Sequence, residues 1–238
     1  MKLYGKNPVI ERIRSNPQSI RRILVEQGHA DHGFIAQKAK KWGIPVSAVP
    51  ASQLLKIARN VNTQGIVADV DDFLYTPYVE LLEMASSKHW SILFLDGVTD
   101  PQNLGSILRS LGCLGGFAVV LPTKDSVSVT EAVLRIASGG ENFVRISQVS
   151  NLAQAIVKAK DAGFWIAGSV VQEGEDLSHA KLQFPLGLVV GSEQKGIRDV
   201  ILQHVDLKLT IPMAKNKMSL NVAQAATIFA YEISRQKK

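Results

Sequence analysis

Five near-continuous apolar runs in the second part of the chain constrain its fold most. They are ILFLD (92–96), FAVVLP (117–122), FWIAGSV (164–170), LGLVVG (186–191) and LKLTIPM (207–213). Strands that are apolar on both faces are typical of parallel sheets covered by helices on either side. Helices are expected between these runs, at about 103–114, 129–138, 151–162 and 197–204. The pattern predicts a doubly wound α/β domain whose ligands bind beyond the carboxyl ends of the strands.

The first 72 residues predict a second, smaller α/β unit. Helices are expected at about 8–14, 34–42 and 51–59, and strands at about 23–25, 45–49 and 65–70. Gly43 supports the end of the middle helix, because glycine readily adopts the left-handed conformation that terminates many helices. Residues 73–90 carry a turn and one short helix, and they are expected to link this unit to the larger domain over 91–238.

The charge of the chain favours a polyanionic partner. Its 238 residues carry a formal net charge of +6, and the sequence pI is about 9.4. Basic side chains concentrate in two stretches, namely Arg12, Arg14, Arg21, Arg22, Lys38, Lys40 and Lys41 near the front and Lys208, Lys215 and Lys217 near the back. Such an excess attracts nucleic acid, although an ordinary solvated surface accounts for the same residues about equally well.

Apolar content and cysteine usage together indicate a cytoplasmic protein. No apolar run reaches the roughly 18 residues that a membrane helix needs, and residues 1–15 contain no apolar signal-peptide core. Cys113 is the one cysteine, so an internal disulfide is excluded and a reducing compartment is expected. We expect Cys113 to be a small buried residue.

Polar loops follow three of the predicted strands. The first, at 97–110, places Asn103 near the start of a helix and Arg109 six residues later. The second begins at Gly191 and ends at Gly196, and these glycines let the backbone approach a ligand closely. A plain helix cap and a solvated arginine are the simpler interpretations of Asn103 and Arg109. Because parallel strands end at one edge of a sheet, the loops are expected to meet in a single site.

The third polar loop leads from Ile211 into a long apolar helix. Ser219 is predicted to cap that helix, because its hydroxyl can accept hydrogen bonds from the first turn. Asn221 in the first turn and the lysines just before it are more polar than a cap requires, which favours a polar or anionic ligand at this helix N-terminus. An ordinary capped helix is the simpler interpretation.

Motifs for other ligand chemistry are missing from the sequence. Neither the P-loop pattern GxxxxGK[ST] nor the dinucleotide-binding pattern GxGxxG occurs. His29 and His32 are three residues apart but are joined by no cysteine or acidic cluster, so no metal site is predicted. The histidines are expected at the surface.

Together the three loops resemble the sequence motifs of the SpoU-type, or TrmH-like, RNA 2'-O-ribose methyltransferases of the SPOUT superfamily. The motifs correspond to Asn103–Arg109, to Val190–Glu193 through Gly196, and to Ile211–Met213 with Ser219–Val222. The front unit, with residues 5–9 and 64–68, is similar to the L30e-like substrate-binding domain of bacterial members that act on large-subunit rRNA. These members methylate guanosine riboses of 23S rRNA.

The resemblance implies a C-terminal SPOUT domain with a trefoil knot, which would be an exception to unknotted chain connections. It further implies S-adenosylmethionine as the cofactor, contacted by Gly191, Ile211 and Leu220. An obligate homodimer with composite active sites is expected, together with a structured RNA as substrate.

The resemblance also assigns catalytic roles. Glu193, Ser219 and Asn221 would line the site, and Asn103 and Arg109 would reach the target ribose and its phosphate. A guanidinium does not deprotonate readily, so we expect Arg109 to clamp the phosphate and stabilise developing oxyanion charge. Lys215 and Lys217 would add positive charge beside the substrate path.

The leading hypothesis is therefore 2'-O-methylation of a guanosine in large-subunit rRNA. A tRNA 2'-O-methyltransferase of the same family and a non-catalytic RNA-binding protein are the alternatives. DNA is excluded as a substrate because it lacks the 2'-hydroxyl, and no membrane partner is expected. The set of catalytic-type residues argues against pure binding, which does not require it.

Overall fold

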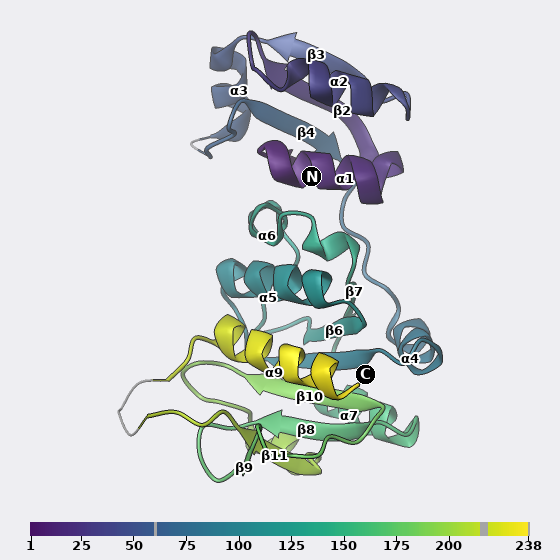
Figure 1. The fold of residues 1–238 in the computed structure, drawn as a ribbon, viewed down its shortest axis with the longest axis vertical. Coiled ribbons are helices and arrows are strands. Elements are labelled where there is room, and N and C mark those ends of the chain that lie inside the picture. Colours follow the sequence, from purple (N-terminus) through teal and green to yellow (C-terminus); the bar gives the residue numbers. More distant parts are fainter. Residues whose placement is uncertain (60, 215–218, 238) are drawn as a thin grey trace.

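The computed structural model describes residues 1–59, 61–214 and 219–237. Figure 1 shows an elongated molecule in which a small N-terminal unit stands on a larger C-terminal domain. Lys215 and Lys217, which were expected beside the substrate path, lie outside the described residues.

A mixed four-stranded sheet forms the centre of the N-terminal unit in the described residues. Its order is β1 (Lys2–Tyr4), β4 (Ile66–Val70), β2 (Ile20–Glu26) and β3 (Val46–Val49). The helices are α1 (Lys6–Ser15), α2 (His32–Lys40) and α3 (Ala51–Ala58). The three predicted helices and three predicted strands are confirmed, and β1 is an additional strand, too short to be recognised from periodicity.

The C-terminal domain contains a sheet whose seven strands, counted over the described residues, all pair in parallel. The order is β7 (Arg145–Val149), β6 (Phe117–Pro122), β5 (Ser91–Asp96), β10 (Leu186–Gly191), β8 (Trp165–Ser169), β11 (Leu207–Thr210) and β9 (Glu175–Asp176). Each predicted apolar run forms a strand, which confirms the predicted parallel α/β sheet. The run at 207–213 is strand only as far as Thr210, and β7 and β9 were not predicted because one contains polar residues and the other has two residues.

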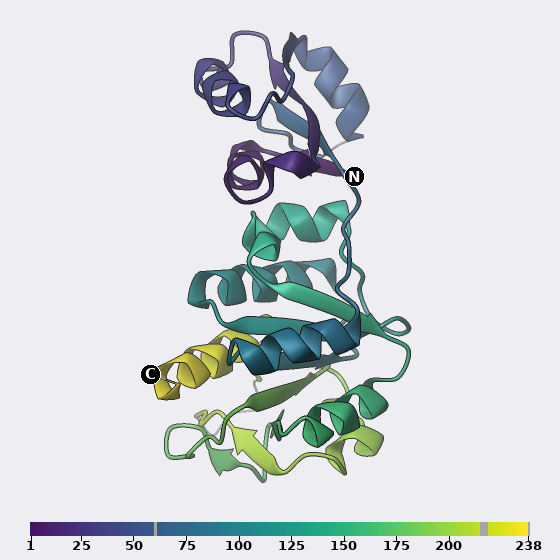
Figure 2. The same cartoon turned by 90° about the vertical axis from the view of Figure 1, so that its right-hand side faces the viewer.

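Helices cover both faces of this sheet (Figures 1 and 2). They are α4 (Tyr78–Ser87), α5 (Pro101–Leu114), α6 (Glu131–Ala137), α7 (Leu152–Asp161), α8 (Asp199–Leu202) and α9 (Val222–Gln236), with a short 3₁₀ turn, η2 (Gly140–Asn142), after α6. Alternate residues of β5 serve opposite faces: Leu93 and Leu95 pack with α5 and α9, and Ile92 and Phe94 pack with α4 and α7. A strand with helices on both faces buries the side chains of both faces, so its residues form a continuous apolar run.

The buried side chains that pack with α5 and α9 belong to a cluster that continues into the N-terminal unit. It includes Leu3 and Val9 of that unit as well as Leu104 and Leu188 of the C-terminal domain. The two parts therefore share a packed boundary. None of the helices in the described ranges combines the length and hydrophobicity that a bilayer crossing demands.

Candidate active site

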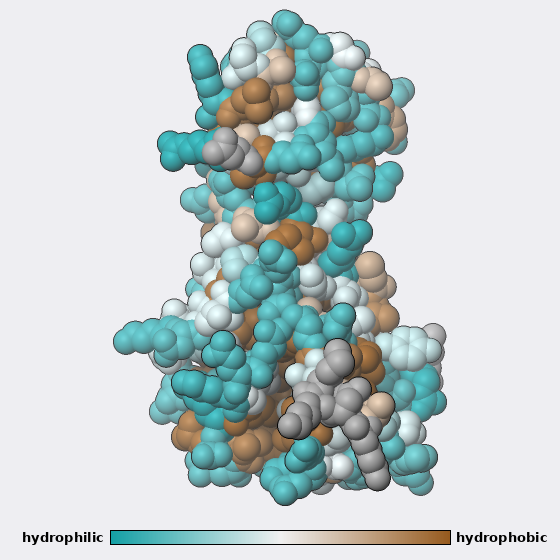
Figure 3. Space-filling model, turned by 90° about the vertical axis from the view of Figure 1, so that its left-hand side faces the viewer, coloured by the Kyte–Doolittle hydropathy of each residue, from teal (hydrophilic) through white to brown (hydrophobic). Residues whose placement is uncertain are grey.

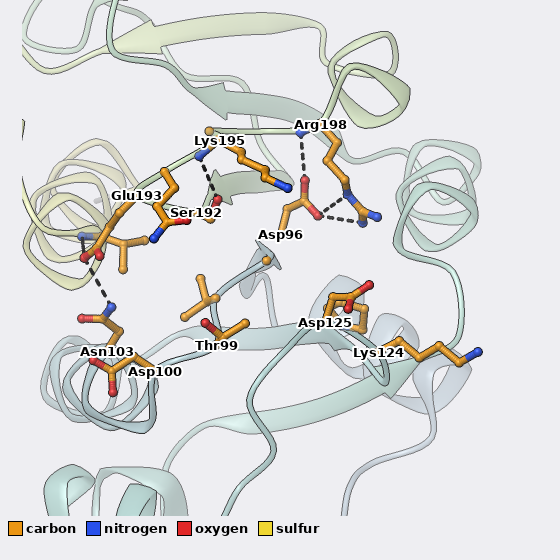
Figure 4. A pocket seen from close by; sticks show the side chains of 16 residues that line it. Asp96, Thr99, Asp100, Asn103, Lys124, Asp125, Ser192, Glu193, Lys195 and Arg198 are labelled. Atoms are coloured by element: carbon orange, nitrogen blue, oxygen red, sulfur yellow. Dashed lines mark hydrogen bonds and ion pairs between the residues drawn. The ribbon is translucent and has the colours of Figure 1, made fainter.

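The site lies where β5 and β10 end side by side. Asp96 is the last residue of β5, is 1% exposed, and pairs in register with Gly191 of β10. Its carboxylate accepts the Arg198 backbone N–H at 2.9 Å and the Arg198 Nε–H at 2.8 Å (Figure 4). This double contact ties the loop after β10 to the end of β5. Sequence analysis missed Asp96 and Arg198, although an acidic residue that closes an apolar strand is a usable signal.

Three predicted catalytic residues meet in one hydrogen-bonded cluster, which we call the Asn–Glu–Asn cluster (Asn103, Glu193 and Asn221). The Asn221 Nδ2 donates to Asn103 Oδ1 at 2.9 Å and to Glu193 Oε1 at 2.5 Å. The Asn103 Nδ2 donates to the same carboxylate oxygen at 3.3 Å (Figure 4). The three side chains come from α5, the loop after β10 and the start of α9, so only the fold brings them together.

The orientation of the Asn221 amide follows from the helix that it caps. Its Oδ1 accepts the Ala223 backbone N–H at 2.9 Å, and the Gln224 side chain completes a capping box. Because the oxygen faces the helix, the amide nitrogen must face Glu193 and Asn103. Asn221, not Ser219, is therefore the N-cap of α9, and the prediction for Ser219 is wrong. A residue with two hydrogen-bonding ends serves the helix and the cluster at once.

Asn103 is not the N-cap of its helix either. Asp100 caps α5 by accepting the Gln102 backbone N–H at 2.8 Å. The Asn103 side chain is therefore free to bond with Glu193, which makes the simpler interpretation of Asn103 as a cap wrong.

A hollow of about 330 Å³, the α9 hollow, opens beside the cluster between the ends of β8, β10 and β11 and the start of α9. Gly191, Ile211 and Leu220, the predicted cofactor contacts, all line it, and so does Ser219. Its walls also include the apolar side chains of Val170, Val190, Val222 and Phe229. Figure 3 looks onto this edge of the molecule and shows hydrophobic residues gathered there among polar ones.

The backbone at Gly191 explains the shape of this hollow. A Cβ at Gly191 would lie 2.1 Å from the Gly196 carbonyl carbon, so only glycine lets the loop fold back here. The fold-back is held by hydrogen bonds between the backbones of Ser192 and Gly196, at 2.9 and 3.1 Å. The apolar walls and the backbone lining suit a molecule that combines an aromatic base with polar groups, as S-adenosylmethionine does.

A second hollow of about 370 Å³, the β5 hollow, lies on the other side of the same loop. Thr99, Asn103, Lys124, Asp125 and Arg198 are among its lining residues (Figure 4). Glu193 and Val222 line both hollows. The Asn–Glu–Asn cluster therefore stands at the junction of two spaces of similar size.

Arg109 does not join the cluster. It lies six residues after Asn103 on α5, about 240° around the helix at 100° per residue, and its side chain is exposed. It is not among the described residues that line either hollow. Cys113, further along the same helix, is exposed as well, so the prediction that it is buried is wrong. The buried face of α5 is formed by Leu104, Ile107, Leu108 and Leu111.

A parallel α/β sheet with two adjoining hollows at its strand ends and a carboxylate–amide cluster between them is an arrangement suited to holding two ligands side by side. The chain belongs to the SpoU rRNA methylase family, whose model matches residues 91–231. The model for RNA 2'-O ribose methyltransferase substrate binding matches residues 2–76.

Individual proteins agree with this assignment. The chain is 34% identical to a putative TrmH family tRNA/rRNA methyltransferase of Staphylococcus epidermidis, over 99% of this chain and 95% of that protein. It is 35% identical to an uncharacterized tRNA/rRNA methyltransferase of Synechocystis, of whose length it spans 62%, over 99% of this chain. The crystal structure of the SpoU methyltransferase AviRb from Streptomyces viridochromogenes, in complex with AdoMet, superposes with a TM-score of 0.82 at 22% identity, covering 100% of this chain and 90% of that one.

The predicted family, the methyltransferase class and the SPOUT-type fold are thereby confirmed. AviRb, which has the same fold, is solved with bound S-adenosylmethionine, the cofactor that the sequence predicts for this chain. The trefoil knot stays a prediction, since part of the segment between β11 and α9 lies outside the described residues.

Proposed function

We propose that this protein transfers a methyl group from S-adenosylmethionine to a ribose 2'-hydroxyl in large-subunit rRNA, most specifically at a guanosine. The position of the Asn–Glu–Asn cluster between the two hollows carries this proposal. The α9 hollow would hold the cofactor, whose sulfonium supplies an electrophilic methyl group. The β5 hollow would receive the target nucleoside.

Glu193 and Asn103 would orient the target hydroxyl. A ribose hydroxyl is a weak nucleophile when neutral, so its alignment supplies much of the rate. The Glu193 carboxylate can accept the hydroxyl hydrogen bond, because the Asn103 and Asn221 amides and the Val222 N–H, at 3.3 Å, all donate to its Oε1, and a carboxylate has a second acceptor oxygen. Asn221 would hold this carboxylate in place, and Ser219 would contact the ligands from the wall of the α9 hollow.

Arg109 would serve the site of a second copy of the chain. Its guanidinium stays charged and matches a phosphate with a fork of donors. Within one protomer it is exposed on α5, away from the Asn–Glu–Asn cluster. The neighbouring helix α9 presents exposed apolar side chains, with Tyr231 61% and Ile228 38% exposed. A homodimer with composite sites accounts for both features.

The N-terminal unit would read the RNA through α2. Of the basic residues that the sequence singled out, Arg12 is buried, and Arg21 and Arg22 pair with Asp71 and Asp69. Arg12 is therefore committed within the protein, and the charges of Arg21 and Arg22 are already paired at its surface.

On α2 and directly after it, by contrast, Lys38, Lys40 and Lys41 make no salt bridge with any residue that the structure describes. Exposed Phe34 and Trp42 lie on the same stretch, and Lys38 Nζ is 5.5 Å from the centroid of the Phe34 ring. Lysines contact phosphates and aromatic rings stack on unpaired bases, so this surface suits single-stranded segments of a structured RNA.

The substrate-binding unit favours rRNA over tRNA, because a separate reading unit suits a target embedded in a large folded RNA. The proposed substrate would place the protein in the cytoplasm. The Asn–Glu–Asn cluster counts against a non-catalytic RNA-binding protein, since binding alone needs no such arrangement between two hollows.

Methyl transfer from labelled S-adenosylmethionine to unmodified rRNA and tRNA tests the proposal, with 2'-O-methyl sites mapped afterwards. Label at one guanosine ribose of large-subunit rRNA is expected, and Glu193→Gln serves as the inactive control. Label on tRNA would keep the chemistry but reassign the substrate. Absence of cofactor binding would contradict the enzymatic proposal and favour the RNA-binding alternative.

A further inference from the structure

The N-terminal unit is held against the C-terminal domain by two carboxylates. Glu131 of α6 accepts the Lys2 backbone N–H at 2.7 Å and the Tyr4 hydroxyl at 2.9 Å. Glu141 of η2 accepts from Arg12 Nη2 of α1 at 3.0 Å. These contacts lie where α1 faces α6 in Figures 1 and 2. The boundary between the two units therefore combines specific polar contacts with apolar packing.

The Arg12–Glu141 ion pair is removed from water. Arg12 is 5% and Glu141 is 4% exposed. Arg12 Nη1 also donates to Ser19 Oγ at 3.2 Å, and the Glu141 carboxylate accepts from Asn142 Nδ2 at 3.1 Å. Breaking a buried pair leaves a charge without a partner, so the pair holds its two elements in one relative position.

The glycines that precede Glu141 connect this pair to α5. A Cβ at Gly139 would lie 2.4 Å from Glu11 Cγ of α1, and Gly139 has a φ of +97°. A Cβ at Gly140 would lie 2.7 Å from the Cα of Arg109. A Cβ at Gly112 would likewise lie 2.9 Å from the Cα of Gly140. Residues 139–141 thus lie between α1 of the N-terminal unit and the turn of α5 that carries Arg109, and they contact both.

We propose that Arg12 and Glu141 are positioning residues that fix the orientation of the RNA-reading unit relative to Arg109. This inference rests on the proposed function, in which Arg109 contacts the substrate RNA. On the α1 side, η2 is held by the Arg12–Glu141 ion pair. Between η2 and α5, backbone-to-backbone contact through Gly140 and Gly112 leaves no flexible side chain to absorb a displacement, so a shift of η2 reaches α5 directly. RNA bound to the N-terminal unit is then presented to the methyltransferase dimer in a fixed register.

Amide hydrogen exchange and steady-state kinetics of the full chain test the proposal together. Arg12→Met is expected to accelerate exchange at residues 108–112 of α5 by about tenfold, because their packing partner η2 is released. The same variant should lower kcat on RNA by about tenfold or more and leave the KM for S-adenosylmethionine unchanged. Arg14→Met is the matched control, since it removes the same charge from an exposed position on the same helix.

Two further variants separate positioning from simple loss of stability. Gly140→Ala removes neither charge of the ion pair but adds a Cβ that meets the Arg109 backbone, so it should reproduce both effects. The double variant Arg12→Met with Glu141→Met removes both charges and should lose much less than the sum of the single variants. If Arg12→Met fails to fold, Arg12→Lys, which keeps the charge but loses the donor fork, is measured instead.

Unchanged exchange at 108–112 in Arg12→Met and Gly140→Ala would overturn the proposal. Additive losses in the double variant would overturn it as well. If the wild type methylated no RNA, the proposed function would fail, but the exchange measurement would still decide whether Arg12 and Glu141 control the turn that carries Arg109.

Discussion

At the scale of single residues, the site depends on side chains that have two tasks. Asn221 caps α9 with its oxygen and holds Glu193 and Asn103 with its nitrogen. Asp96 ends β5 and anchors the loop after β10 through Arg198. Because each atom has its own partner, the two tasks of Asn221 can be separated by a substitution of the same size.

Asn221→Asp should keep the helix cap and lose the cluster. An aspartate oxygen still accepts from the Ala223 N–H, but it cannot donate to Asn103 and it places a second negative charge beside Glu193. We expect kcat to fall by about a hundredfold, the loss typical of removing an acid–base or orienting group, with Tm changed by only a few degrees. Kinetics and thermal unfolding measure the two quantities.

Asn151→Asp is the matched control for this substitution. Asn151 caps α7 in the same way, with its side chain accepting the Gln154 N–H at 3.1 Å, but lies outside both hollows. It should leave turnover unchanged. Full activity in Asn221→Asp would remove the cluster from the mechanism.

At the scale of elements, helices carry different functions on different faces. α5 directs Asn103 to the cluster, uses Gly105 and Gly112 to pack closely on α6 and η2, and exposes Arg109. The stretch from α2 to Trp42 exposes Phe34, Lys40, Lys41 and Trp42, while Ile35 and Ala39 are buried. Because a helix turns once every 3.6 residues, one face can pack in the core while the opposite face stays available to a ligand.

Trp42→Ala should weaken binding of a single-stranded RNA oligonucleotide by about tenfold, in line with roughly 1–3 kcal/mol for each stacked base. The salt dependence of binding should stay the same, because no charge is removed. Lys41→Ala should instead reduce the slope of log K against log salt by about 0.7. Fluorescence anisotropy at several salt concentrations measures both.

Trp165→Ala provides the comparison for Trp42, because Trp165 is 42% exposed on β8 of the other domain. Its affinity for the oligonucleotide should equal that of the wild type. Equal losses in both tryptophan variants would show that α2 is not the stacking surface.

Glu141 of the 3₁₀ turn η2 is expected to make the stability of the protein depend on pH. Burial raises the pKa of the Glu141 carboxyl above its ordinary value, and the Arg12 guanidinium opposes this shift in part. The folded protein therefore binds the proton more tightly than the unfolded chain, and the contribution of this group to stability is lost as pH rises from about 4.5 through the folded-state pKa.

The difference in unfolding free energy between the wild type and Glu141→Gln should accordingly fall as pH rises through that window. Denaturant titrations at pH 4 to 7 measure it. A difference that rises with pH would mean that the ion pair outweighs the cost of burial.

At the scale of the whole molecule, the proposed dimer divides each site between two chains. The Asn–Glu–Asn cluster is complete within one protomer, whereas Arg109 is exposed elsewhere on its surface. The N-terminal unit is fixed to its own C-terminal domain through Arg12 and Glu141. Substrate binding and catalysis would therefore be linked through the assembly.

Mixing two inactive variants tests this division. Arg109→Ala and Glu193→Gln are each expected to abolish turnover with cofactor binding retained. If Arg109 acts on the partner's cluster, a heterodimer of the two variants contains one site with both defects and one intact site, so co-expressed mixtures should regain turnover. With both residues serving the same protomer, every site would carry one defect and the mixture would stay inactive.

Much of this protein follows from its sequence alone. The apolar runs that become β5, β6, β8, β10 and β11 required a doubly covered parallel sheet, because strands so uniformly apolar are stable only when both faces are buried. The three polar loops had to meet at one sheet edge because the strands that they follow run parallel. Asn103, Glu193 and Asn221 were therefore predictable as neighbours.

Tertiary structure alone decided which atoms pair. The Asn221 amide bonds to Asn103, Arg12 is buried instead of facing RNA, and Arg109 is directed away from the cluster. Local patterns describe a residue's place within its own helix turn, over three or four positions. The deciding contacts join residues 90 to 129 positions apart, and their geometry is set by strand order and helix packing, which no local pattern contains.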